Sequence, residues 1–204
     1  MTLQQNTDRI RTTHIGSLPR PHHILDLMKA RLSGQPYDQK AYDAAISAGV
    51  ADNVRRQVAC GIDIITDGEL SKPGFFSYVQ QRLNGFEPRP DRKFKLFPRE
   101  IAAFPEYYEQ YFKDAMMGGA VVPLVCTGPV SYRGDSHVKT DIANLKAAAQ
   151  AVDVPNERLF LPAVAPSGVG FNEYYRSEEE YFHAVAQALS HEYRAIVEAG
   201  ILLQ

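Results

Sequence analysis

The feature that most constrains the fold is a unit that occurs twice: a helix end, a glycine and an apolar strand. Val58-Ala-Cys-Gly61 precedes the run 62–66, and Val197-Glu-Ala-Gly200 precedes the run 201–204. Neither run alternates cleanly between polar and apolar residues, which indicates strands buried on both faces and therefore a parallel sheet. Repeated helix–glycine–strand units predict an α/β protein, either a (β/α) barrel or a doubly wound sheet.

The turns that follow the strands favour the barrel. No Gly-x-Gly-x-x-Gly follows a strand, which disfavours the dinucleotide-binding version of the doubly wound sheet. The strands end instead in short polar or Gly-Pro turns, and such turns at strand ends build barrel active sites. We therefore predict a (β/α)8 TIM-type barrel, truncated after about five strands, with parallel strands at 12–16, 62–66, 121–126, 159–164 and 201–204. Residues 1–9 are expected to form a flexible N-terminus and residues 10–204 a partial barrel.

Helices are expected between these strands. Apolar residues at spacings of three and four predict them at 24–32, 39–60, 74–83, 105–116 and 139–152. Ser177 and Glu180 form a capping box that opens a further helix, which ends before Gly200.

Composition excludes several classes of protein. Lys and Arg number 22 against 24 Asp and Glu, a net charge of −2, which argues against a nucleic-acid-binding protein. No apolar run reaches the roughly 18–20 residues that span a bilayer, so no membrane partner is expected. The start of the chain shows no secretory signal, and two cysteines, Cys60 and Cys126, fit a reducing cytoplasm.

Two carboxylates directly follow the strand 62–66. Asp67-Gly-Glu69 would place acids at the mouth of the sheet, where they could bind an amine, a metal ion or a proton. Alternatively, Asp67 caps the next helix and Glu69 is merely solvated.

A second candidate site is the turn His14-Ile-Gly-Ser17. The N–H groups of Gly16 and Ser17 could hold a carboxylate, or the segment could be an ordinary turn beside a packed histidine. Arg20 could bind an anion or form a structural ion pair, and Thr127 could line a pocket or only end a strand. Because parallel strands place such residues at one rim, we expect Ser17, Glu69 and Thr127 around one cleft.

No zinc site is visible in the sequence. The six histidines and two cysteines form no His-x-Cys, Cys-x-x-Cys or His-x-x-x-His pattern. The chain alone is therefore expected to bind zinc poorly.

Four ordered motifs carry a resemblance to a known family. They are Thr12-Thr-His-Ile-Gly-Ser-Leu-Pro-Arg-Pro21, 61–69, Thr127-Gly-Pro-Val130 and 193–204. In this order they resemble the catalytic half of cobalamin-independent methionine synthases, and above all the short, single-barrel methionine synthase II-like proteins. The match runs from about residue 10 to residue 204.

The resemblance implies a (β/α)8 barrel that moves a methyl group from 5-methyltetrahydrofolate to the thiol of homocysteine, which a zinc ion binds as thiolate. It implies that the backbone of Ile15, Gly16 and Ser17 holds the amino-acid carboxylate and that Glu69 holds the amino group. In the family, the zinc ligands and a general-acid histidine follow the strand that begins here at Ile201. We therefore assign no catalytic or metal-binding residue in this chain.

The resemblance also leaves alternatives open. The long enzymes have Thr where His14 stands and His where Asp67 stands, and both replacements resemble the short proteins. The second acid beside Glu69, Asp67, puts strict homocysteine specificity in question. One alternative is alkyl transfer to another thiol, as in the related coenzyme M-dependent epoxide-opening enzymes. Another is a non-catalytic binding or assembly module whose barrel is completed by another chain, or by swapping in a homo-oligomer.

Overall fold

The computed structural model describes residues 9–92, 97–115 and 122–204. Of the predicted flexible N-terminus, only Arg9 lies within these ranges, and residues 1–8 lie outside them. Val121, the first residue of the predicted strand 121–126, and Met116, the last residue of the predicted helix 105–116, also lie outside them. In chain order the elements are α1 (His22–Leu32), α2 (Gln39–Ala59), β1 (Ile65–Thr66), α3 (Phe75–Arg82), β2 (Leu83–Pro88), α4 (Pro98–Ala103), α5 (Pro105–Ala115), β3 (Leu124–Tyr132), α6 (Asp135–Gln150), η1 (Asn156–Arg158), β4 (Leu159–Leu161), η2 (Pro166–Gly168), β5 (Phe171–Asn172), α7 (Glu178–Glu198) and β6 (Leu202–Leu203).

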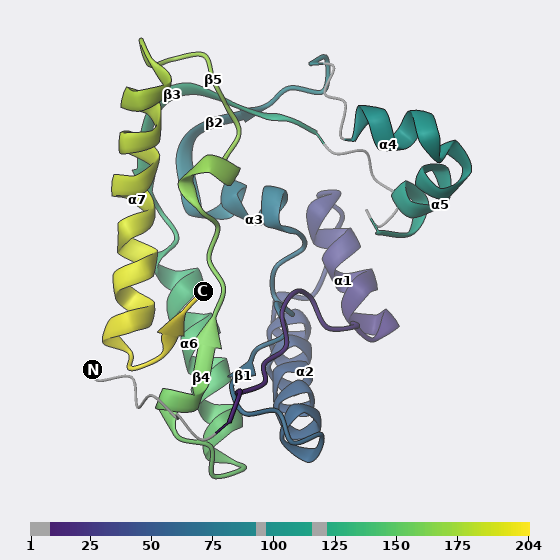
Figure 1. Cartoon of the computed structure of the whole chain (residues 1–204), viewed down its shortest axis with the longest axis vertical. Coiled ribbons are helices and arrows are strands. Elements are labelled where there is room, and N and C mark those ends of the chain that lie inside the picture. The colour runs from purple at the N-terminus through teal and green to yellow at the C-terminus, as the bar shows by residue number, and fades with distance from the viewer. Residues whose placement is uncertain (1–8, 93–96, 116–121) are drawn as a thin grey trace.

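One sheet is parallel throughout, as the repeated units predict. Its order is β1-β4-β6, with Ile65 opposite Leu159 and Phe160 opposite Leu202. A parallel bridge from Thr13 to Ile64 adds the N-terminal segment beside β1. The described chain therefore has four parallel strand positions in sequence order. Figure 1 shows β1 and β4 of this sheet side by side.

The predicted strand 121–126 does not belong to this sheet, so the expectation of five parallel strands is wrong. It lies in β3, in a second sheet of order β2-β3-β5, where β3 pairs antiparallel with β2 and parallel with β5. Thr-Gly-Pro does not end the strand, which continues to Tyr132. From Thr127 onward β3 is only partly buried, as is typical of an antiparallel strand with one wet face.

The partner strand β2 was not predicted, and a glycine makes its pairing possible. The register shifts between Asn84 and Phe86, and Gly85 at the shift has φ +89°. A Cβ at Gly85 would lie 2.6 Å from the carbonyl oxygen of Pro129. Only glycine therefore allows β2 and β3 to approach this closely.

Three helices cover the parallel sheet, each in the crossover before the next strand. α2 packs against α6, and α6 packs against α7. Asp38 caps α2 by accepting from the N–H of Lys40, and Ser177 caps α7 by accepting from the N–H of Glu180, which confirms the predicted cap. α6 begins at Asp135, earlier than predicted. An apolar core that includes Val54, Leu145 and Leu159 lies between the helices and the sheet.

A buried ionic cluster joins the two sheets' helices. Arg82 of α3 lies 2.7 Å from Asp141 of α6 and 3.4 Å from Glu192 of α7, and Tyr132 of β3 donates to Glu192 at 2.8 Å. All three charged side chains are less than a tenth exposed.

Within the described part of the chain, no helix is both long and apolar enough to cross a membrane.

Candidate functional site

The turn after β1 has a strained backbone at the edge of the parallel sheet. Gly68 and Glu69 both adopt left-handed conformations, with φ of +70° and +56°. For a non-glycine residue this conformation costs about 1–2 kcal/mol. Asp67 offsets part of that cost, because its Oδ1 accepts the N–H of Glu69 at 2.8 Å. Asp67 therefore stabilises the turn itself rather than capping the next helix.

The turn brings the two predicted binding motifs together. The hydroxyl of Ser17 donates to Oε2 of Glu69 at 2.8 Å, and the N–H of Leu18 donates to the carbonyl of Gly68 at 3.0 Å. Glu69 is buried, whereas Ser17 is exposed. The carboxylate of Glu69 therefore lies buried directly beneath the exposed Ser17 of the His14–Ser17 turn.

The His14–Ser17 turn presents backbone donors. Gly16 has φ +86°, and the Nε2–H of His14 donates to the carbonyl of Gly16 at 2.9 Å. Among the described residues, no backbone acceptor is found for the N–H of Gly16 or of Ser17. Ile15 projects its side chain outward, at 71% exposure. The turn therefore contributes N–H groups rather than apolar contact.

Arg20 stabilises the strained turn through its backbone carbonyls. Its guanidinium donates to the carbonyls of Glu69, Leu70 and Lys72, at 2.6, 3.0 and 2.6 Å. Burial lowers the pKa of Arg20, and the nearby Glu69 opposes this. Because its guanidinium donates to backbone carbonyls, Arg20 is better placed to support the turn than to bind an anion.

Sequence reasoning missed Lys72, a buried cation at this edge. Lys72 is 4% exposed, and its Nζ donates to the carbonyl of Pro162, just after β4, at 2.5 Å. Burial raises the pKa of Asp67, and the charge of Lys72 counteracts that rise. Nothing local marks Lys72 as buried, because it is covered by residues ninety positions away.

Thr127 does not follow a strand of the parallel sheet, which the prediction had assumed. It lies inside β3 of the second sheet instead of following a parallel strand, so the premise that placed it beside Ser17 and Glu69 is wrong. Within 9–92, 97–115 and 122–204, no three His, Cys, Asp or Glu side chains gather as a metal site requires.

The fold and the site define an α/β protein with donors and carboxylates at the ends of its parallel strands. Residues 10–93 match the model of the family described as "Cobalamin-independent synthase, Catalytic domain". The chain is similar to cobalamin-independent methionine synthases over part of its length, which confirms the resemblance carried by the motifs.

The individual relatives are named as methionine synthases or homocysteine methyltransferases, and they are longer than this chain. The methionine synthase of Sulfolobus acidocaldarius is 24% identical over 93% of this chain and 49% of its own length. The 5-methyltetrahydropteroyltriglutamate–homocysteine methyltransferase of Thermosynechococcus vestitus is 28% identical over 73% of this chain and 21% of its own. A solved B12-independent methionine synthase from Shewanella sp. W3-18-1 shares the fold, with a TM-score of 0.62 at 18% identity, over 93% of this chain and 49% of that one. The chain thus spans half or less of the length of these relatives.

Proposed function

We propose that this chain supplies the amino-acid-binding part of an S-methyltransferase that moves a methyl group from 5-methyltetrahydrofolate to the thiol of homocysteine. The observation that carries the proposal is the contact of Ser17 with Glu69 at the end of β1. It sets a carboxylate beside two N–H groups without acceptors among the described residues. That pairing complements the ammonium and carboxylate groups of an α-amino acid.

The role of each group follows from its charge. The carboxylate of Glu69 binds the substrate ammonium, and the N–H groups of Gly16 and Ser17 bind the substrate carboxylate. The hydroxyl of Ser17 orients Glu69 through the 2.8 Å hydrogen bond. Asp67 and Arg20 act indirectly, because they hold the left-handed turn that presents Glu69.

Zinc, when bound, would supply a thiolate at neutral pH in a reaction of this kind. The described residues do not provide a fitting donor set, so no step is assigned to zinc here. What these residues do is bind and orient the amino-acid end of the thiol substrate. In this proposal the four parallel strands are part of a (β/α)8 barrel, whose substrate sites lie at the C-terminal ends of the strands.

The test is titration calorimetry of the chain with L-homocysteine and L-methionine. Glu69→Gln removes the charge that binds the ammonium, so it should weaken binding by about tenfold to a hundredfold. N-acetyl-L-methionine, which has no ammonium, should bind the wild-type chain poorly. Ser17→Ala keeps the backbone N–H and should cost less than Glu69→Gln.

Glu157→Gln in η1 is the matched control, because it makes the same change at an exposed glutamate distant in sequence from the site. It should leave the affinity unchanged. Wild-type chain that binds neither amino acid, or Glu69→Gln that binds as tightly as the control, would contradict the proposal.

A further inference from the structure

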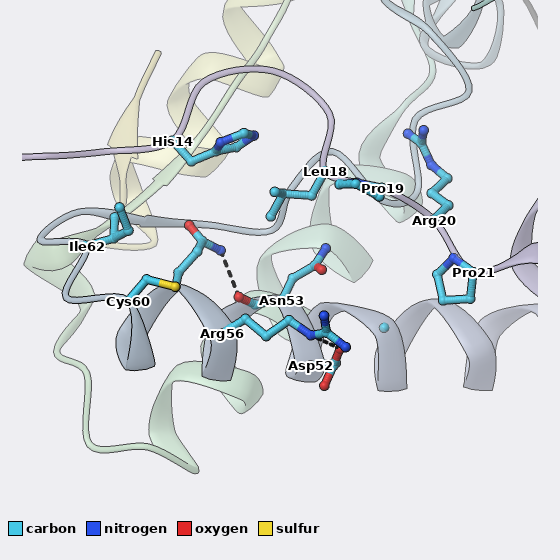
Figure 2. Close-up of a pocket in the computed structure, with 12 residues that line it drawn as sticks. His14, Leu18, Pro19, Arg20, Pro21, Asp52, Asn53, Arg56, Cys60 and Ile62 are labelled. Atoms are coloured by element: carbon cyan, nitrogen blue, oxygen red, sulfur yellow. Dashed lines mark hydrogen bonds and ion pairs between the residues drawn. The ribbon is translucent and has the colours of Figure 1, made fainter. Parts of the chain in front are cut away.

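The segment 69–72, which follows β1 and carries Glu69, is anchored on three other parts of the fold. Its backbone forms a turn, in which the N–H of Lys72 donates to the carbonyl of Glu69 at 3.0 Å. Arg20 anchors the carbonyls of this turn, and Figure 2 shows its side chain extending away from α2. Two further anchors are the side chains of Ser71 and Lys72, which have no role in the function proposed above.

Ser71 ties the turn to α6. Its hydroxyl donates to Oδ1 of Asp141 at 2.8 Å, while Oδ2 of the same carboxylate accepts from Arg82 at 2.7 Å. Arg82 in turn pairs with Glu192 of α7. Asp141 is therefore fixed by the buried cluster that joins α3, α6 and α7, and it holds Ser71 in place.

Lys72 ties the turn to the end of β4. β1 and β4 are neighbours in the parallel sheet, so the segments that follow them leave the sheet at the same edge. The Nζ of Lys72 reaches from one segment to the other, where it donates to the carbonyl of Pro162 at 2.5 Å. It also lies 5.4 Å from the ring centroid of Tyr78, whose hydroxyl accepts the N–H of Val164 at 2.7 Å. Lys72 and Tyr78 therefore both hold the segment after β4.

Packing alone does not require the charge of Lys72. The side chain is 4% exposed, and an apolar side chain of similar length would fill the same space without the cost of removing an ammonium from water. What the ammonium adds is a directed, charge-assisted hydrogen bond to Pro162. Such a bond fixes the separation of the two segments more tightly than an apolar contact would.

We propose that Ser71 and Lys72 are positioning residues of the amino-acid site. They hold Glu69 at the separation from the His14–Ser17 turn that an α-amino acid requires. Neither residue touches the substrate, and their effect on affinity passes through Glu69, whose left-handed backbone would relax without these anchors. This inference rests on the proposed function, because it takes Glu69 as the group that binds the substrate ammonium.

Titration calorimetry of Lys72→Met with L-methionine tests the proposal through the sign of the change. Lys72 is a cation in the same turn as Glu69, so removal of its charge would by itself favour the substrate ammonium and tighten binding. Loss of the contact with Pro162 lets the turn move and should instead weaken binding by about threefold to thirtyfold. Lys139→Met, at an exposed lysine of α6, is the matched control and should leave the affinity unchanged.

Ser71→Ala repeats the test without a change of charge. It removes the hydrogen bond to Asp141 and should weaken binding by about twofold to tenfold. Ser71→Thr keeps the hydroxyl and should restore most of the affinity. The control is Ser190→Ala in α7, which removes a hydroxyl bonded to the carbonyl of Gln187 at 2.7 Å and should not change binding.

A second substitution at Glu69 separates positioning from a general defect of the fold. If Lys72 acts through Glu69, Lys72→Met added to Glu69→Gln should weaken binding no further than Glu69→Gln alone. A general defect would show its full effect in the double variant as well. Hydrogen exchange supplies a measurement without ligand: the N–H of Glu69, which Asp67 accepts, should exchange faster in Lys72→Met, while exchange in α7 stays the same.

The outcomes distinguish this inference from the function on which it rests. Lys72→Met or Ser71→Ala that binds as tightly as its control, or more tightly, would overturn the positioning role while Glu69→Gln still weakens binding. Additive losses in the double variant would overturn it too. Glu69→Gln that binds like the wild type would overturn the amino-acid site and the positioning role together. Should Lys72→Met fail to fold, Ser71→Ala decides alone.

Discussion

Replacing Asp141 by Asn should destabilise the chain far more than an equivalent change on the surface. Burial alone would lower the pKa of Arg82, but the carboxylates of Asp141 and Glu192 raise it above its usual value. The Asp141 pair is the shorter, at 2.7 Å. Losing one partner of a buried ion pair costs about 3–5 kcal/mol.

Two contacts that remain in the variant reduce this expected loss of stability. Glu192 remains 3.4 Å from Arg82, and the new amide can still accept from the hydroxyl of Ser71, which lies 2.8 Å from Asp141. We therefore expect a loss of about 2–4 kcal/mol in the free energy of unfolding. For a chain of this size that lowers the melting temperature by roughly 4–16 °C.

Urea unfolding followed by circular dichroism and tyrosine fluorescence measures the change, since the chain has 11 Tyr and no Trp. The control is Glu173→Gln, which removes a carboxylate 2.5 Å from Arg92 where both side chains are at least a third exposed. An exposed pair contributes at most about 1 kcal/mol. If the two variants lose equal stability, the argument that burial sets the strength of the Arg82 cluster is refuted.

Three further predictions concern the turn, the second sheet and metal binding. Because burial raises the pKa of Asp67, its folded form retains a proton that the unfolded chain releases, so stability should fall as pH rises from the ordinary Asp pKa through the raised one. Asp67→Asn should remove that fall in urea unfolding from pH 4 to pH 7, and an unchanged profile would count against it. Gly85→Ala should lower the free energy of unfolding by at least about 2 kcal/mol, because the new Cβ adds an overlap with the backbone of β3 to the strain of a left-handed residue. Gly34→Ala, at φ +68° with open space around it, should lower it by about 1 kcal/mol, from the strain alone. Equal losses in the two variants would contradict the close approach of β2 and β3. The chain alone should bind zinc weakly in calorimetry, and tight stoichiometric binding would show a donor set beyond the described residues.

The sequence by itself determined what depends on neighbours along the chain. The helix–glycine–strand units predicted β1, β6 and the parallel sheet, because buried strands and glycine helix ends have local signatures. The cap at Ser177 followed for the same reason. The proximity of Ser17 and Glu69 was also predictable, since parallel strands end at one edge.

Tertiary structure alone decided which sheet the 121–126 segment joins and which charges are buried. An apolar run is equally suited to either sheet, and the choice depended on Leu83–Pro88, about forty residues earlier, whose glycine permits the pairing. Lys72 and Arg82 look like surface residues in the sequence, yet both are buried because partners from distant segments, such as Pro162, Asp141 and Glu192, surround them. Pairing over such distances is set by the packing of whole elements, which no local pattern encodes.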